Sequence, residues 1–102
     1  MILLTENDIN YFDSTNVLFS HYDQFNRRLF ICFQGGQTYK YTNISIELNK
    51  SFLEANSQGK FINENIKDKY HFVKDKKYTK FEMDLVMSAV NKMKKQQLNE
   101  KK

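Results

Sequence analysis

The chain has 102 residues, of which 40% are hydrophobic and 15% aromatic, enough for one folded domain but hardly for two. Its formal net charge is +4, but the first 26 residues hold four acidic side chains and no Lys or Arg, and the rest of the chain therefore carries +8. Because there is one cysteine, and because the opening apolar run ends at Thr5, we expect no disulfide framework, no secretory signal, no transmembrane helix and a cytoplasmic location.

The first half of the chain reads as an acidic arm followed by a β-meander. Residues 1–13 show no sustained period, and their Asn and Asp side chains favour turns, so we expect an arm there. Three runs rich in β-branched and aromatic residues follow, separated by a polar turn and by a Gly-Gly pair. These runs, at residues 17–22, 28–33 and 38–42, predict neighbouring antiparallel strands.

The length of each turn sets which side chains share a face. A five-residue turn at 23–27 places one set on the core side, namely Val17, Phe19, Leu29, Ile31 and Phe33, and another on a mixed face, namely Leu18, Ser20, Tyr22, Arg28, Phe30 and Cys32. A three-residue turn at 35–37 pairs Tyr39 with Phe33 and Tyr41 with Ile31. We prefer it to a two-residue turn, because the shorter turn buries the Lys40 ammonium at a cost of several kcal/mol.

Helical spacing begins after the third strand. Ser45 is a plausible N-cap for a helix whose apolar positions Leu48, Phe52 and Ala55 recur at i, i+4 and i+7. Ser57 can cap a second short helix with apolar positions at Phe61, Ile62 and Ile66. We therefore expect two short helices, both packed on the core face of the sheet.

The last third of the chain combines a charged linker, a long helix and a basic tail. Residues 74–77 are Lys-Asp-Lys-Lys, which indicates a solvated linker, and 98–102 form a basic tail. Between them, 79–97 predict an amphipathic helix with Met83, Val86, Val90 and Met93 on one stripe and Phe81, Leu85 and Ala89 beside it. The whole pattern predicts an α+β fold: an antiparallel three- to four-stranded sheet, two short helices on one face and an additional C-terminal helix.

A set of spaced motifs runs through the middle of the chain. They are Asn16-Val17, Tyr22-Asp23, Leu29-x-Ile31-x-Phe33-x-x-Gly36-x-x-Tyr39-x-Tyr41, Ala55-x-Ser57-x-Gly59-Lys60-Phe61-Ile62-Asn63 and Ile66-Lys67-x-x-Tyr70. With them, residues 14–70 resemble the KTSC domain, a module named for its occurrence at the C-terminus of some lysyl-tRNA synthetases, and Tyr39 and Tyr41 match its central YxY motif. The resemblance implies a domain over 14–73 and suggests RNA binding, and it supplies no catalytic residue.

A first candidate site is a phosphate-binding turn. Ser57, Gly59 and Lys60 bring a hydroxyl, an unhindered backbone N–H and an ammonium within one helical turn, and Lys67 and Lys69 could extend the site toward a polyanion. The alternative is an ordinary capped helix with a glycine for close packing, since capping alone explains Ser57.

A second candidate site is the mixed face of the sheet. Tyr22, Arg28, Phe30 and Lys40 interleave aromatic rings with cations, a pattern that can stack bases while neutralising phosphates. The alternative is that the apolar stripe of the C-terminal helix, or a second subunit, covers this face.

Nothing in the sequence favours catalysis or a cofactor. The expected register puts Cys32 and His21 on opposite faces, and no His, Cys or acidic cluster has a spacing typical of a metal site. We therefore expect a noncatalytic binding module for RNA or another phosphate-bearing ligand such as a nucleotide, with no metal and no cofactor. The alternative is a protein-interaction or oligomerisation module, a viral or mobile-element accessory protein, that binds a second copy or another protein through residues 79–97 and no membrane.

Overall fold

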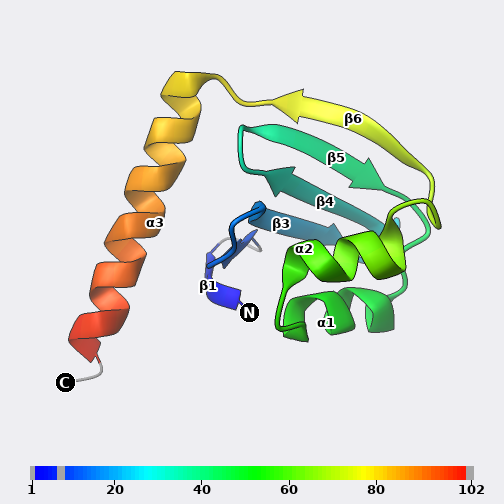
Figure 1. Cartoon of the computed structure of the whole chain (residues 1–102), viewed down its shortest axis with the longest axis horizontal. Helices are drawn as coiled ribbons and strands as arrows, with labels where there is room; N and C mark the ends of the chain where they lie inside the picture. Colours follow the sequence, from blue (N-terminus) through cyan, green and yellow to red (C-terminus); the bar gives the residue numbers. More distant parts are fainter. Residues whose placement is uncertain (1, 7–8, 101–102) are drawn as a thin grey trace.

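The computed structural model describes the backbone of residues 2–6 and 9–100 and the side chains of residues 9–92. Six antiparallel strands form one sheet in chain order, with two short helices against one face (Figure 1). Side chains of a long C-terminal helix pack against the other face. The α+β prediction is confirmed. The elements are β1 (Ile2–Glu6), β2 (Ile9–Phe12), β3 (Val17–Asp23), β4 (Arg28–Phe33), β5 (Gln37–Tyr41), α1 (Ile46–Glu54), α2 (Gln58–Phe61), the π-helical turn η1 (Ile62–Ile66), β6 (Phe72–Lys77) and α3 (Lys80–Glu100).

The sheet is larger than the three or four strands that the sequence favours. Part of the expected acidic arm forms β1 and β2, which extend the sheet from β3. The expected linker at residues 74–77 belongs to β6, an exposed strand that pairs with β5. Edge strands often carry lysines, which discourage pairing with other chains, so composition alone could not separate this strand from a solvated linker.

A β-bulge in β3 changes the first hairpin. The expected five-residue turn is wrong, because Asp23 lies opposite Arg28. Near the turn Tyr22 then pairs with Leu29, and the register shifts by one residue between Val17 and Phe19, so that Val17 still lies opposite Phe33 as expected. An extra residue in one strand turns the side chains on its two sides relative to each other.

The bulge exchanges the faces of several β3 side chains. Tyr22, expected on the mixed face, packs with the core beneath α1 and α2. Phe19, expected in that core, lies on the opposite side with Leu18 and Cys32. The bulged residue Leu18 is 1% exposed, so both faces of the sheet are apolar at this point.

The second hairpin keeps the predicted faces with a different register. Tyr39 pairs with Ile31 rather than Phe33, and Tyr41 with Leu29 rather than Ile31. Because the pairing moved by two residues, both tyrosines still face the main core and Lys40 still faces away from it.

The main core lies between the sheet and the two short helices. It is built from residues of the strands, of α1 and of η1, namely Phe12, Val17, Leu29, Ile31, Tyr41, Ile44, Phe52, Ile62 and Ile66. The predicted cap of α1 is confirmed, because Ser45 Oγ accepts a hydrogen bond from the Leu48 N–H at 3.0 Å.

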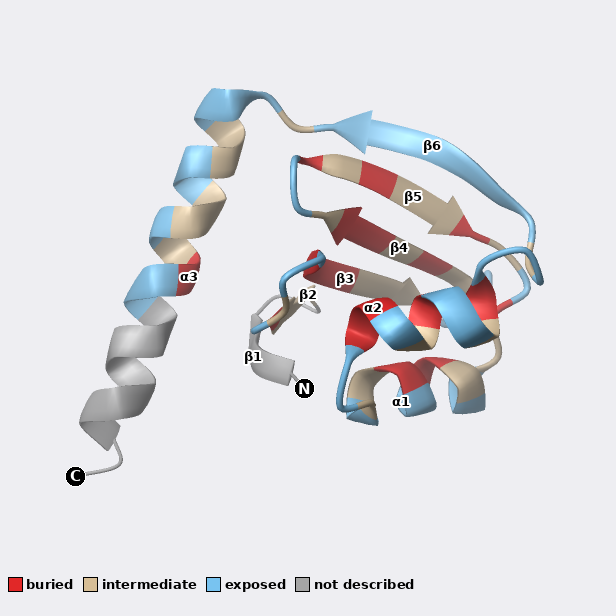
Figure 2. Ribbon diagram, viewed as in Figure 1, coloured by how far each residue is buried: buried red, intermediate tan, exposed pale blue. Residues whose placement is uncertain are grey.

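The second sheet face, on the side away from α1 and α2, carries a smaller apolar cluster. Leu18, Phe19 and Cys32 pack there against Tyr78 and three side chains of α3, which are Met83, Val86 and Met87. Burial therefore follows one stripe of α3, as Figure 2 shows for its first half. A reciprocal cap fixes the start of α3: Thr79 Oγ1 accepts from the Glu82 N–H at 3.1 Å, and Glu82 Oε1 accepts from the Thr79 N–H at 3.0 Å. No helix in the described part of the chain is long and apolar enough to cross a membrane.

Candidate functional site

A cleft of about 520 Å³ opens on the second sheet face. Strands β2 to β6 line it together with the segment that leads into α3. We call it the aromatic-basic cleft; its lining residues are Ile9, Phe19, His21, Asp23, Arg28, Phe30, Thr38, Asp75, Lys76 and Tyr78. Its size lies within the range of small-ligand pockets, about 300 to 1,000 Å³.

Phe30 lies among cationic and aromatic neighbours in this cleft. The His21 ring lies 5.8 Å from the Phe30 ring, tilted by 33°, and the Arg28 guanidinium carbon lies 5.9 Å from its centre. Lys40 sits directly opposite Phe30 on β5. Three of the four residues predicted for a nucleic-acid face, Arg28, Phe30 and Lys40, therefore lie together on the second sheet face.

The Arg28 guanidinium is oriented by a hydrogen bond to Asp23, and not all of its N–H groups are paired. Its Nη2 donates to Asp23 Oδ2 at 2.9 Å. Hydrogen bonds from the Asn26 side chain and from Arg28 lower the pKa of the Asp23 carboxyl to about 2. The Arg28 Nε–H is buried and has no acceptor among the described residues, whereas the side chain as a whole is 36% exposed, so the guanidinium can still meet an anion that enters the cleft.

Lys76 is positioned by the start of α3. Its Nζ lies 2.8 Å from Glu82 Oε2 and 4.5 Å from the centre of the Tyr78 ring. The hydrogen bond from Lys76, followed by the backbone hydrogen bond from Thr79, lowers the pKa of the Glu82 carboxyl to about 2. One wall of the cleft is thus fixed by an ion pair between β6 and α3.

Tyr22 does not belong to this face, so its predicted place in a nucleic-acid surface is wrong. Its hydroxyl donates to the carbonyl oxygen of Ile44 at 2.6 Å, beneath the helices. Burial raises the pKa of the Tyr22 hydroxyl, which keeps it protonated as the donor. The bulge that reversed this part of β3 is the cause.

The turn predicted as a phosphate site is occupied by structural contacts. Ser57 Oγ accepts from the Lys60 N–H at 3.3 Å, and a side chain at Gly59 would place its Cβ 2.8 Å from Asn16 Nδ2. Helix α2 has four residues, and the ammonium of Lys60 lies 3.8 Å from Glu64. The hydroxyl and the glycine therefore serve capping and close packing, while Lys67 and Lys69 are exposed in the segment that follows η1.

The expectation that Cys32 and His21 lie on opposite faces is wrong. Cys32 pairs with Phe19 and His21 pairs with Phe30, and this register places both on the second sheet face. Cys32 is fully buried, its Sγ donates to the Phe33 carbonyl at 3.7 Å, and burial raises the pKa of the thiol. The sulfur is therefore held as the thiol, which is a weak nucleophile.

Comparison with known proteins identifies the family of the central part of the chain. A family model described as the KTSC domain matches residues 13–70. The chain belongs to the KTSC domain family. The crystal structure of a KTSC domain protein from Yersinia pestis is similar, with 31% sequence identity and a TM-score of 0.64 over 67% of this chain and 96% of that one. No curated protein matches the sequence.

The tyrosines of the KTSC motif are structural in this chain. Tyr41 is 5% exposed, and the Tyr39 ring makes edge contacts with Phe33 and Phe72, each with centres 5.5 Å apart. This agrees with the prediction that both rings belong to the core side of the sheet. They join β4, β5 and β6 into one layer beneath the helices.

Sequence reasoning missed the cleft residues outside the KTSC match. Lys76 and Tyr78 lie beyond residue 70, Lys76 within the expected linker and Tyr78 directly after it. Regular alternation along β3 predicts His21 on the core face, and the bulge between Val17 and Phe19 places it on the second sheet face instead. The weak signal was Phe72-Val73, two β-forming residues before the lysines, which could have indicated a sixth strand.

Proposed function

We propose that this KTSC domain is a noncatalytic module that binds single-stranded RNA, or another ligand with a phosphate and an aromatic base, on the second sheet face. The observation that carries the proposal is the arrangement around Phe30. A ring that is only half buried is flanked by the Arg28 guanidinium and by His21, with the Lys40 ammonium on the next strand.

Each part of this arrangement suits one part of a nucleotide. An aromatic side chain can stack on a base, which contributes about 1 to 3 kcal/mol per base. Lys40 and the partly exposed guanidinium of Arg28 can meet phosphate oxygens, and Arg28 is already oriented by its hydrogen bond to Asp23. The net charge of +4 adds a long-range attraction that weakens with salt.

The test is the binding of a fluorescently labelled single-stranded RNA, measured by anisotropy at low salt. We expect Phe30→Ala and Lys40→Glu each to weaken binding by roughly tenfold, as the loss of one stacked base or one phosphate contact implies. Lys60→Glu is the matched control, because it makes the same charge change on α2, at the opposite face of the sheet.

Two outcomes would contradict the proposal. One is an RNA affinity that Phe30→Ala leaves unchanged. The other is an equal loss in Lys40→Glu and Lys60→Glu, which would indicate charge alone or a site at the Ser57 turn. Thermal unfolding of each variant separates a lost contact from a lost fold.

A second candidate function, protein interaction through α3, is supported by a different observation. Phe81 and Leu85 lie one helical turn apart on α3 and are 72% and 57% exposed. Apolar pairs of this kind suit helix-to-helix contact with a second copy or another protein. If the chain self-associates through this pair, Leu85→Lys lowers the native mass of the purified protein. A monomer mass for both the unaltered chain and the variant argues against self-association.

A further inference from the structure

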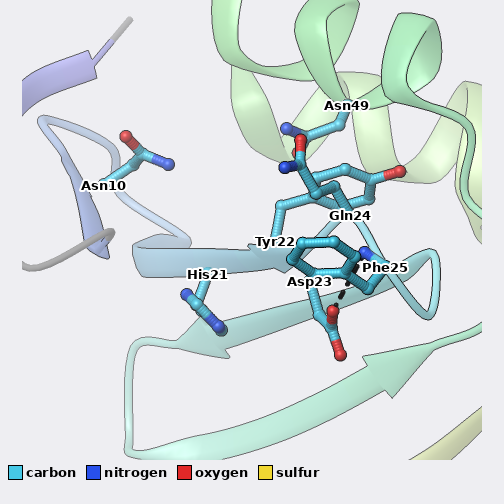
Figure 3. A pocket seen from close by; sticks show the side chains of 7 residues that line it. All are labelled: Asn10, His21, Tyr22, Asp23, Gln24, Phe25 and Asn49. Carbon is cyan, nitrogen blue, oxygen red and sulfur yellow. Dashed lines mark hydrogen bonds between the residues drawn. The ribbon is translucent and has the colours of Figure 1, made fainter.

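A second hollow lies at the turn end of β3, where the strand leaves the sheet. It encloses about 450 Å³ between β2, the turn that joins β3 to β4, and α1. Figure 3 shows Asn10 on one side of it and Asn49, with Gln24 and Tyr22, on the other. The side chains that line it are mainly amides and aromatic rings, unlike the charged walls of the aromatic-basic cleft.

The Asn49 side chain lines this hollow and carries a buried acceptor without a partner. The residue is 9% exposed, and its Oδ1 has no hydrogen-bond donor among the described residues. Its backbone N–H is used within the helix, donating to the Ser45 carbonyl at 3.0 Å. A buried polar atom without a partner costs about 1 to 3 kcal/mol, and a turn of the Asn49 amide toward the hollow, where a ligand supplies the donor, would recover that cost.

Phe25 stands at the rim of the hollow on a turn that is already formed. Its side chain is 90% exposed. The carboxylate of Asp23 accepts hydrogen bonds from the backbone N–H groups of Phe25 and Asn26, both at 3.2 Å, and from the Asn26 side chain at 2.8 Å. The ring is therefore displayed on an ordered backbone, as a stacking surface would be.

The few charged side chains that line the hollow favour an uncharged ligand. Asp23 is the one acidic side chain among the residues that line the hollow, it is already paired with Arg28, and no Lys or Arg lines it. A phosphate would find no cation there, whereas an uncharged group with N–H donors would meet the Asn49 oxygen. A planar group would also gain the face of Phe25.

We propose that this hollow binds a nucleobase, with the hydrogen-bonding edge of the base toward the Asn49 amide and a ring face toward Phe25. Amide side chains suit base edges because they offer a donor and an acceptor side by side. The base can come from a free nucleoside or from an unpaired position of an RNA strand.

The position of the hollow links it to the aromatic-basic cleft. His21 and Asp23 line both. A strand held on the second sheet face can therefore pass the end of β3 and insert its next base into the hollow. This link rests on the proposed function, whereas the binding of a free nucleoside does not.

The test uses the isotope-labelled full chain, titrated with the four ribonucleosides and, as the ligand control, with ribose alone. We expect shifts of the Asn49 side-chain amide signals with at least one nucleoside and none with ribose. Phe25→Ala and Asn49→Leu should each weaken that binding by about tenfold, whereas Phe81→Ala, which removes another exposed ring, should not. Asn49→Leu should also leave the free energy of unfolding unchanged or raised, since it removes an unpaired buried polar atom.

A second arm uses single-base RNA homopolymers, to separate a base within a strand from a free nucleoside. Sensitivity of either arm to Phe25→Ala and Asn49→Leu supports the hollow, and insensitivity of both arms overturns it. Failure of the proposed function looks different: RNA affinity then does not depend on Phe30 or Lys40, while the nucleoside shifts at Asn49 remain.

Discussion

The turn between β4 and β5 is a sensitive point, because the start of α3 rests against it. Gly36 has a φ of +97°, and a Cβ built there would lie 2.9 Å from the carbonyl oxygen of Tyr78 and 3.1 Å from the sulfur of Met83. The Gly36 carbonyl also accepts a hydrogen bond from the Tyr78 N–H at 2.9 Å. The perturbation is Gly36→Ala, and Gly35→Ala is its matched control.

The two substitutions share one cost and differ in another. Gly35 has a φ of +99° and nothing within 4 Å of a built Cβ, so Gly35→Ala meets only backbone strain, roughly 1 to 3 kcal/mol. Gly36→Ala meets a similar strain and also crowds a backbone oxygen, which cannot rotate away. Overpacking of this kind costs about 1 to 3 kcal/mol more.

Urea unfolding followed by circular dichroism measures both losses, with the slope m checked for constancy. We expect Gly36→Ala to lose more stability than Gly35→Ala by the crowding cost. Equal losses would refute the reasoning, because they would mean that Tyr78 and Met83 do not lie against Gly36. The helix would then be docked elsewhere on the sheet.

Three further predictions concern other parts of the fold. Ser45→Ala should lower the free energy of unfolding by about 1 kcal/mol through the lost cap, and Ser51→Ala, at an exposed position inside α1, should not. Tyr22→Phe should cost about 1 to 3 kcal/mol by leaving the Ile44 carbonyl unpaired, with RNA affinity unchanged; an affinity loss without a stability loss would contradict its placement. The Asp23 carboxyl has a pKa of about 2, below its ordinary 3.8, so its contribution to stability is complete above about pH 4 and is lost as the pH falls toward 2. Asp23→Asn should therefore reduce the loss of stability across that interval, and an equal loss in both proteins, measured by urea midpoints, would contradict this.

Local patterns predicted the helices and the faces where no irregularity intervened. Ser45 and Ser57 cap the helices that they were expected to cap, because a cap is encoded within a few residues. The sequence around the bulge at Leu18 has no glycine or other residue that signals a bulge. The alternation of side chains along a regular strand therefore predicted the wrong faces for Phe19 and Tyr22. One extra residue is enough to reverse a pattern of period two.

The candidate site was foreseen in part for the same reason. Arg28 and Phe30 are two residues apart on one strand, so alternation places them on the same face. The cost of burying the Lys40 ammonium predicted its face correctly, although the predicted register between β4 and β5 was wrong. The wall that contains Lys76 and Tyr78 depends on pairing between β5 and β6, at an edge whose lysines resemble a linker. Pairing of that kind is a tertiary property, which single-sequence patterns do not carry.

The order of the strands has a consequence for how the chain folds and for which parts of it can vary. Because every strand pairs with its neighbour in sequence, each pairing closes a short loop, which costs little chain entropy and favours rapid folding from either end. The family match covers β3 to η1, so β1 and β2 lie before the matched unit and β6 with α3 after it. Neither flanking part threads through this unit, because the strands pair in chain order. A lineage could therefore gain or lose a wall of the cleft by changing the ends of the chain, while the central hairpins kept their pairing.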